Sequence, residues 1–313
     1  MLLSRVADHL YWGARYLERA EDTARVVQSY TDLLLDLPMG VNSTWEPLLA
    51  VVGGRELYDL AHTGTDETDV VRFLVADDAN QGSVVASIAQ ARENLRSARE
   101  VLPREAWQAV NDLYLFSGGD REAGVDRRSR GRFLSRVVSD CRRLDGVLAA
   151  SMRRDEAYEL WRLGQALERA DMTTRVLGVR AASLLAARSG DGAHDDFAEV
   201  QWMGVLRSLT ALQMYQRSRR GPIDGTSVVR FLLFDATFPR SVAGAVVQIR
   251  AALGALPRPA ATLPAVEAID EVLAGIDIGA DDGQALDEAM DRVQIALDDV
   301  HEAVYRAFVH GVV

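Results

Sequence analysis

Two stretches of the sequence carry an acid, a second acid and an arginine at successive spacings of three and four residues. They are Glu18, Glu21 and Arg25 in the first half of the chain, and Glu168, Asp171 and Arg175 in the second. On a helix, these spacings place the three side chains on one face. Carboxylates gathered in this way can bind a charged substrate, hold a metal or supply a general acid and base. Acid–arginine pairs at the same spacing also stabilise ordinary helices and fix their register, so both interpretations stay open.

The first stretch requires a long helix to carry it. Small and apolar residues recur at alternating intervals of three and four, which is typical of a helix that packs along a narrow stripe. This helix is expected to run to Asp36, before Pro38, over about 50 Å. The stripe consists of Leu3, Val6, Leu10, Gly13, Leu17, Ala20, Ala24 and Val27.

The charged residues border this stripe at its edge. Arg19 and its counterpart Arg169 are predicted to point further toward solvent. If the helices of the two halves cross, their four carboxylates and two arginines are expected to converge on one cluster.

Several segments repeat in the same order along the chain. Residues 17–27 match residues 167–177 at an offset of 150, and residues 70–74 match residues 228–232 at an offset of 158. The remaining apolar patterns predict further helices, and no series of alternating strands is found. We therefore predict an all-α fold, an elongated antiparallel helical bundle with an internal duplication and a pseudo-twofold axis.

Long helices of both halves are expected to pack together. The sequence thus predicts one domain over residues 1–313, with internal repeats of about 1–150 and 151–313. Among its predicted helices are residues 43–62, 153–189 and 195–218.

A second repeated block suggests an anion site. Ser83 and Ser241 are expected in the first turn of a helix, with Asn80 as N-cap in one copy and Pro239 in the first turn of the other. Free N–H groups at such a turn favour an anion. Plain helix capping explains the same residues, so both possibilities stay open. Positive charge would come from nearby arginines, namely Arg72, Arg230 and Arg240.

The composition limits the possible functions. The net charge of −11 argues against nucleic acid as a partner. All 35 basic residues are arginine, which excludes a Schiff-base or P-loop lysine. Residues 117–131 are predicted to be an exposed connector, and a basic run overlaps its end at Arg127, Arg128, Arg130 and Arg132.

Metal and thiol chemistry find little support. The five histidines form no Glu-x-x-His motif, so neither a metal nor another cofactor is expected. Cys141 is the only cysteine and is expected to be a buried structural thiol. No signal peptide or membrane span is recognisable, which favours the cytoplasm.

Several motifs resemble those of the bacterial alpha-E family. They are residues 3–12 (LSRVADHLYW), 15–21 (RYLERAE), 91–94 (AREN), 167–171 (LERAD) and 238–242 (FPRSV). One departure lies at residues 80–83 (NQGS), where the family often has Asn-Pro before the serine. The resemblance covers essentially the whole chain and implies an all-helical fold.

The resemblance also implies partners. Alpha-E proteins occur alone or fused to a circularly permuted ATP-grasp protein, and are encoded beside ATP-grasp and transglutaminase-like proteins. This implies an accessory or co-catalytic partner of an ATP-grasp-type peptide or amide ligase. Two alternatives remain open: a stand-alone enzyme or binding protein for a charged peptide or amino-acid-like ligand, and a purely structural scaffold.

Overall fold

The computed structural model describes residues 2–36, 44–181, 184, 197–277 and 283–309, and every regular element within them is helical, which confirms the all-α prediction. The first half contains α1 (Ser4–Asp36), α2 (Glu46–Val51), α3 (Arg55–Asp59), α4 (Glu67–Val75), α5 (Val84–Ser97), α6 (Arg104–Gly119), α7 (Arg121–Val125) and α8 (Arg130–Ser151), with a 3-10 turn at Arg99–Val101. The second half contains α9 (Glu156–Val176), α11 (Ala198–Ser208), α12 (Leu212–Ser218), α13 (Gly225–Phe234), α14 (Val242–Ala255), α15 (Leu263–Ala274) and α16 (Gly283–Val304), a 3-10 turn at Pro259–Ala261 and π-helical turns at Leu177–Ala181 and Tyr305–Val309.

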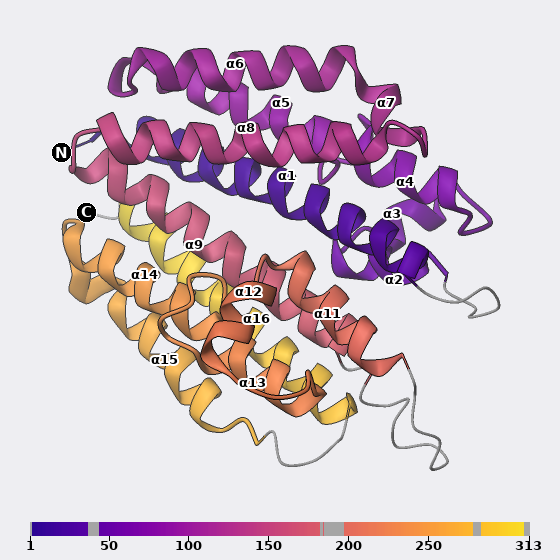
Figure 1. The fold of residues 1–313 in the computed structure, drawn as a ribbon. Helices are drawn as coiled ribbons and strands as arrows, with labels where there is room; N and C mark the ends of the chain where they lie inside the picture. The colour runs from indigo at the N-terminus through magenta and orange to yellow at the C-terminus, as the bar shows by residue number, and fades with distance from the viewer. Residues whose placement is uncertain (1, 37–43, 182–183, 185–196, 278–282, 310–313) are drawn as a thin grey trace.

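The two long helices α1 and α9 pack against each other at the centre of the molecule (Figure 1). Their contacts advance together along both helices: Leu2 N donates to Glu156, and Glu18 meets Arg169 further on. The pair is therefore parallel, which corrects the prediction of a purely antiparallel bundle. The closest approach is at Gly164, where an added Cβ would lie 2.4 Å from the Tyr11 carbonyl oxygen.

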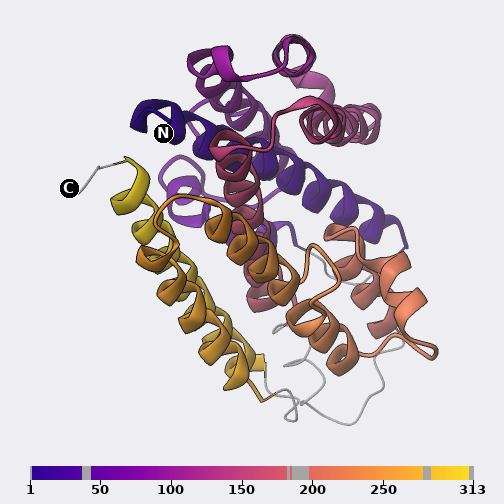
Figure 2. The ribbon, with the colours of Figure 1, turned by 90° about the vertical axis from the view of Figure 1, so that its left-hand side faces the viewer.

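Further helices flank each member of this central pair. α5 and α8 pack on α1, with α6 over them, while α14 and α16 pack on α9, with α15 beside both (Figure 1). Turned by 90°, the ribbon shows these two groups on opposite sides of the central helices (Figure 2). The order of helices around α1 thus recurs around α9. The duplication itself stays a prediction.

Local capping explains where several helices begin. Asp66 and Asp224 cap α4 and α13, and Ser83 and Ser241 cap α5 and α14, each accepting hydrogen bonds from backbone N–H groups of the first turn. The two residues of each pair are 158 residues apart, so the repeated block also repeats the capping residues at which these helices begin.

Two predicted helices are broken at matching places. Residues 43–62 form α2 and α3, separated at Gly53 (φ +67°), and residues 195–218 form α11 and α12, separated at Thr210 (φ +55°). These left-handed conformations interrupt an α-helix. Residues 43, 182–183, 185–189 and 195–196 of the predicted helices lie outside the described residues.

The predicted connector at residues 117–131 is also corrected. It holds the end of α6, all of α7 and the start of α8, and Arg130 is 1% exposed. Its guanidinium donates to Glu67 at 2.8 Å and to the Val125 carbonyl at 2.9 Å.

Cys141 is buried as predicted, and its burial raises the pKa of its thiol. Within the described ranges, no helix combines the length and apolar character that a membrane crossing requires.

Candidate functional site

A reciprocal exchange of ion pairs joins the two central helices. Glu18 of α1 accepts from Nε and Nη2 of Arg169, both at 2.9 Å. Glu168 of α9 accepts from Nε of Arg19 at 2.5 Å and from its Nη2 at 3.1 Å. Arg19 and Arg169 therefore turn inward to the facing helix, and the prediction that they point to solvent is wrong.

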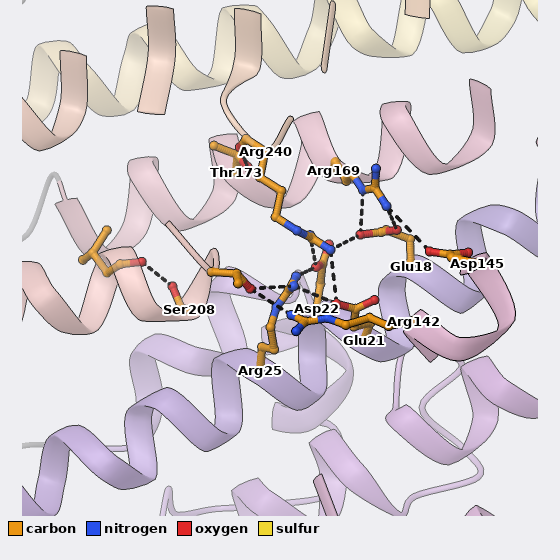
Figure 3. Close-up of polar contacts among 12 residues, drawn as sticks. Glu18, Glu21, Asp22, Arg25, Arg142, Asp145, Arg169, Thr173, Ser208 and Arg240 are labelled. Carbon is orange, nitrogen blue, oxygen red and sulfur yellow. Dashed lines mark hydrogen bonds and ion pairs between the residues drawn. The ribbon is translucent and has the colours of Figure 1, made fainter. Parts of the chain in front are cut away.

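The first-half cluster gathers around Glu18 and Glu21 (Figure 3). Arg240, which directly precedes the α14 cap, reaches Glu18 at 2.6 Å, Glu21 at 3.2 Å and Asp22 at 2.7 Å. Glu21 also accepts from Arg25 at 2.8 Å and from Arg142 of α8 at 3.1 Å.

Burial and opposite charges compete within this cluster. Burial raises the pKa of Glu18, but the guanidiniums of Arg169 and Arg240 outweigh it and lower the pKa to about 2. Burial and the nearby Arg240 lower the pKa of Arg25 to about 9. Burial and the negative charge of Glu18 raise the pKa of Asp145 to about 7. Asp145 is thus the carboxyl that titrates near neutral pH.

The second-half cluster is arranged differently. Glu168 accepts from Arg15 at 2.8 Å in addition to Arg19, and Asp171 accepts from Nε of Arg175 at 3.0 Å. Burial raises the pKa of Glu168, but the charges of Arg19 and Arg15 outweigh it and hold the pKa below its ordinary value.

Pockets border the crossing on both sides. The Arg240 pocket, of about 330 Å³, is lined by Glu21, Arg142, Asp145, Arg169, Thr210, Phe238, Pro239 and Arg240. The Gly82 pocket, of about 260 Å³, is lined among others by Arg19, Thr23, Gly53, Asn80, Gly82, Glu168, Asp171 and Arg175. The four predicted carboxylates therefore do not share one pocket: Glu21 faces the first, and Glu168 and Asp171 face the second.

A third pocket opens on the other side of the Asp171–Arg175 pair. This His301 pocket, of about 350 Å³, is also lined by Arg15, Asp298 and Asp299. His301 shares a hydrogen bond of 2.7 Å with the Tyr11 hydroxyl, and burial and the charge of Arg15 lower the pKa of the histidine. The sequence did not predict that His301 reaches a pocket beside α1, because a lone histidine on α16 carries no motif that indicates this contact.

The predicted anion site does not assemble. Ser83 and Ser241 are the N-caps themselves, with Oγ accepting from Ala86 N at 3.2 Å and Gly244 N at 2.9 Å, and Pro239 lies before the helix rather than in its first turn. The arginines predicted beside the serines separate: Arg72 pairs with Glu122 at the surface, Arg230 is exposed and Arg240 enters the first-half cluster.

Carboxylate oxygens of Glu18, Glu21 and Asp145 lie within 4.8 Å of one another, a spacing that can hold a metal ion. Here, however, Glu18 and Glu21 are contacted by Arg25, Arg142, Arg169 and Arg240. A divalent cation at this place would meet several guanidiniums at close range. The cluster is therefore suited to arginine rather than to a metal.

The Glu-Arg dipeptide occurs at two places in the sequence, residues 18–19 and 168–169, and both form the crossing. A family model described as an alpha-helical domain with a conserved ER motif matches residues 2–309. This chain belongs to the Alpha-E family. The two Glu-Arg dipeptides fit the ER motif of Alpha-E, and the structure gives them a physical role, because each glutamate pairs with the arginine of the other.

Curated relatives of this Alpha-E chain include an uncharacterized protein of Mycobacterium bovis and two of Mycobacterium tuberculosis. Each is 23% identical over 295 residues, which is 86% of this chain and 31% of the relative. The chain thus spans about a third of the length of the curated relatives it matches. No solved structure gives a significant match.

Proposed function

We propose that this Alpha-E chain is an accessory or co-catalytic partner of an ATP-grasp-type peptide or amide ligase. Its contribution is to bind a charged amino-acid-like or peptide ligand in the Gly82 and His301 pockets. The first-half cluster, whose carboxylates are held by arginines, acts in this proposal as a structural clamp.

One observation carries the ligand-binding part of the proposal. The Asp171–Arg175 pair forms a wall of both pockets, and its side chains are 20% and 33% exposed. An amino acid or peptide end presents an ammonium and a carboxylate, which suit a carboxylate and a guanidinium respectively. Volumes of about 260 and 350 Å³ fit a ligand of that size.

The partner rests on other grounds. Motifs of the chain resemble a family encoded beside ATP-grasp and transglutaminase-like proteins, and its relatives carry the matching region as 31% of a longer chain. A domain joined to others in one chain is suited to act with them. Because such a ligase uses ATP, we infer that the protein works in the cytoplasm.

Co-purification and ligand binding test the two parts separately. The full chain is expected to retain an ATP-grasp protein from an extract of its own bacterium, and to bind amino acids or dipeptides in isothermal titration. Asp171→Asn should weaken ligand binding about tenfold, because a charge-assisted hydrogen bond is lost. The exposed Asp59→Asn provides a matched control.

Each negative result has a distinct meaning. A chain that binds the ligand but never associates with the ligase contradicts the accessory role and favours a stand-alone binding protein or enzyme. A chain that associates with the ligase but binds no amino acid or peptide contradicts the ligand-binding role.

A further inference from the structure

We propose that the Gly82 pocket takes the cationic end of a ligand, a guanidinium or a primary ammonium group. This inference rests on the proposed function and names the charge of the ligand group that enters this pocket. The Gly82 pocket beside Asp171 is compared with the Arg240 pocket, which occupies the matching place beside Glu21.

The walls of the two pockets correspond at several positions, although Arg142 and Asp145 line the Arg240 pocket alone. Glu21 and Asp171 lie 150 residues apart on α1 and α9, as do Arg169 and Arg19 in opposite order. Thr210 and Gly53, both with positive φ, occupy matching breaks after α11 and α2. The two pockets therefore share a common frame.

The frames differ at one decisive position. Arg240 directly precedes the N-cap Ser241, and its guanidinium enters the first-half cluster. Gly82 directly precedes the N-cap Ser83, and it has no side chain that could enter the second-half cluster. The space that a guanidinium fills on one side is open on the other.

Arg240 contacts carboxylates of the first-half cluster. Their counterparts in the second half can each accept a further hydrogen bond. Oε1 of Glu18 accepts from Arg169 and from Arg240, whereas Oε1 of Glu168 accepts from Arg19 alone within the described residues. Arg15 contacts the other oxygen of Glu168. A carboxylate oxygen has two lone pairs, so Glu168 can accept one more N–H.

Asp171 shows the same difference from its counterpart. Glu21 accepts from three arginines, Arg25, Arg142 and Arg240. Over the described ranges, Asp171 accepts only from Nε of Arg175. Glu168 and Asp171 thus offer a cation two carboxylates on one pocket wall.

A buried hydroxyl supports the inference independently. Thr173 on α9 donates to the Arg240 carbonyl at 2.8 Å. Its counterpart Thr23 on α1 lines the Gly82 pocket and is 1% exposed, and its Oγ1 has no hydrogen-bond partner among the residues described. Buried hydroxyls are normally satisfied. The hydroxyl oxygen has almost no accessible surface, so a ligand N–H would give Thr23 its missing partner only with a turn of the Thr23 side chain toward the pocket.

The surrounding charge is compatible with a cation. The linings of the Gly82 and His301 pockets together carry four carboxylates, Glu168, Asp171, Asp298 and Asp299, against three guanidiniums, Arg15, Arg19 and Arg175. The Gly82 pocket alone holds two carboxylates against two guanidiniums, so the negative excess comes from Asp298 and Asp299 of the His301 pocket, which shares Asp171 and Arg175 with it. A volume of about 260 Å³ accommodates a guanidinium on a short alkyl chain.

Agmatine, which carries both a guanidinium and a primary ammonium group, is the probe that tests the inference on the full chain. Isothermal titration is expected to show saturable one-site binding of agmatine and none of succinate. Gly82→Arg should tether a guanidinium in the pocket and weaken agmatine binding at least about tenfold. An added Cβ at this position would lie 3.3 Å from Asn80 Oδ1 and meet no other atom within 4 Å, so a side chain requires only a small shift of Asn80. Gly254→Arg, where an added Cβ meets nothing within 4 Å, is the control and should bind as the wild type does.

A second variant keeps the test independent of Gly82. Thr23→Val preserves the shape of the side chain and removes the unpartnered hydroxyl, so it should weaken agmatine binding several-fold while leaving the melting temperature unchanged or higher. Agmatine that binds Gly82→Arg and Thr23→Val as tightly as the wild type would overturn the inference.

The outcomes separate this inference from the proposed function. If agmatine fails to bind while an acidic amino acid or succinate binds, the cation site is refuted and the proposed function stands. If neither agmatine nor any amino acid or dipeptide binds, both are refuted.

Discussion

The Glu18 carboxylate and the Arg169 guanidinium form a two-point pair across parallel helices, with both donor–acceptor distances at 2.9 Å. Glu168 and Arg19 repeat the pair in the opposite sense. Because both glutamates are buried, a slip of either helix would leave charges without partners. The two pairs together therefore specify how α1 and α9 align.

Breaking one of these pairs is expected to destabilise the fold. Arg169→Met leaves the buried Glu18 with Arg240 as its remaining close partner, and should lower the free energy of unfolding by about 3 kcal/mol. The double variant Glu18→Gln/Arg169→Met should recover a large part of that loss, as measured by urea unfolding. Arg96→Met, in an exposed pair with Glu93, is the control and should change stability by less than about 0.5 kcal/mol. A loss for Arg169→Met no larger than the control would contradict this role.

The close approach of α1 and α9 gives a second prediction. A Cβ at position 164 would lie 2.4 Å from a backbone carbonyl oxygen, so Gly164→Ala must push the helices apart. We expect a loss of about 2 to 3 kcal/mol in unfolding free energy. Gly146→Ala, at an exposed helical position with open space, should instead raise it by about 0.5 to 1 kcal/mol. Equal effects of the two substitutions would show that the helices do not touch at Gly164.

Asp145 is expected to make stability depend on pH. Its pKa is about 7 in the folded protein and 3.8 in an ordinary environment, so between these values the folded state holds a proton that the unfolded state has lost. The contribution of Asp145 to the free energy of unfolding therefore falls as pH rises from about 4 to about 7, and it stays low above pH 7. Glu18, with a folded pKa of about 2, has the opposite effect, but below pH 4.5.

Asp145→Asn isolates this effect. The variant and the wild type should have similar unfolding free energies near pH 4, and the advantage of the variant should grow from pH 5 to pH 8. The difference should reach a few kcal/mol, since a pKa difference of one corresponds to about 1.4 kcal/mol. A stability difference that stays constant from pH 5 to pH 8 would argue against a raised pKa.

Arg130 should matter more than its neighbours in the same basic run. Arg130→Met removes the ion pair with Glu67 and the bond to the Val125 carbonyl, and should lower the melting temperature by several degrees. Arg132→Met, at an exposed position two residues away, should leave it nearly unchanged. If both variants melt alike, the buried contacts of Arg130 carry little stability.

The sequence predicted the long first helix well, because its apolar stripe and its end before Pro38 are local signals. The structure places this helix at Ser4–Asp36. The repeated charged residues were also found, since their spacing is visible on one helix. The angular position of a residue around its helix, however, only shows where its side chain lies relative to the apolar stripe of that same helix. Arg19 and Arg169 lie off that stripe, yet each turns toward a carboxylate that the facing helix supplies.

Long-range partners were beyond the sequence for the same reason. Arg240 lies more than 200 residues from Glu21, and nothing near it indicates that it enters this cluster. The relative direction of α1 and α9 also depends on connections whose path is not encoded locally. The break at Thr210 was missed because threonine is an unusual residue at positive φ. The break at Gly53 does have a local signal, the Gly53-Gly54 pair, which the prediction of one helix over residues 43–62 did not use.

The parallel central pair has a consequence for synthesis on the ribosome. α1 emerges first, but the arginines that neutralise Glu18 follow about 150 and 220 residues later. Until then, the nascent first half carries carboxylates on a surface that is buried in the finished protein, and these keep it hydrated. The face of α1 that meets α9 is therefore completed only when the second half arrives, whereas the contacts of α1 with α5 and α8 lie within the first half.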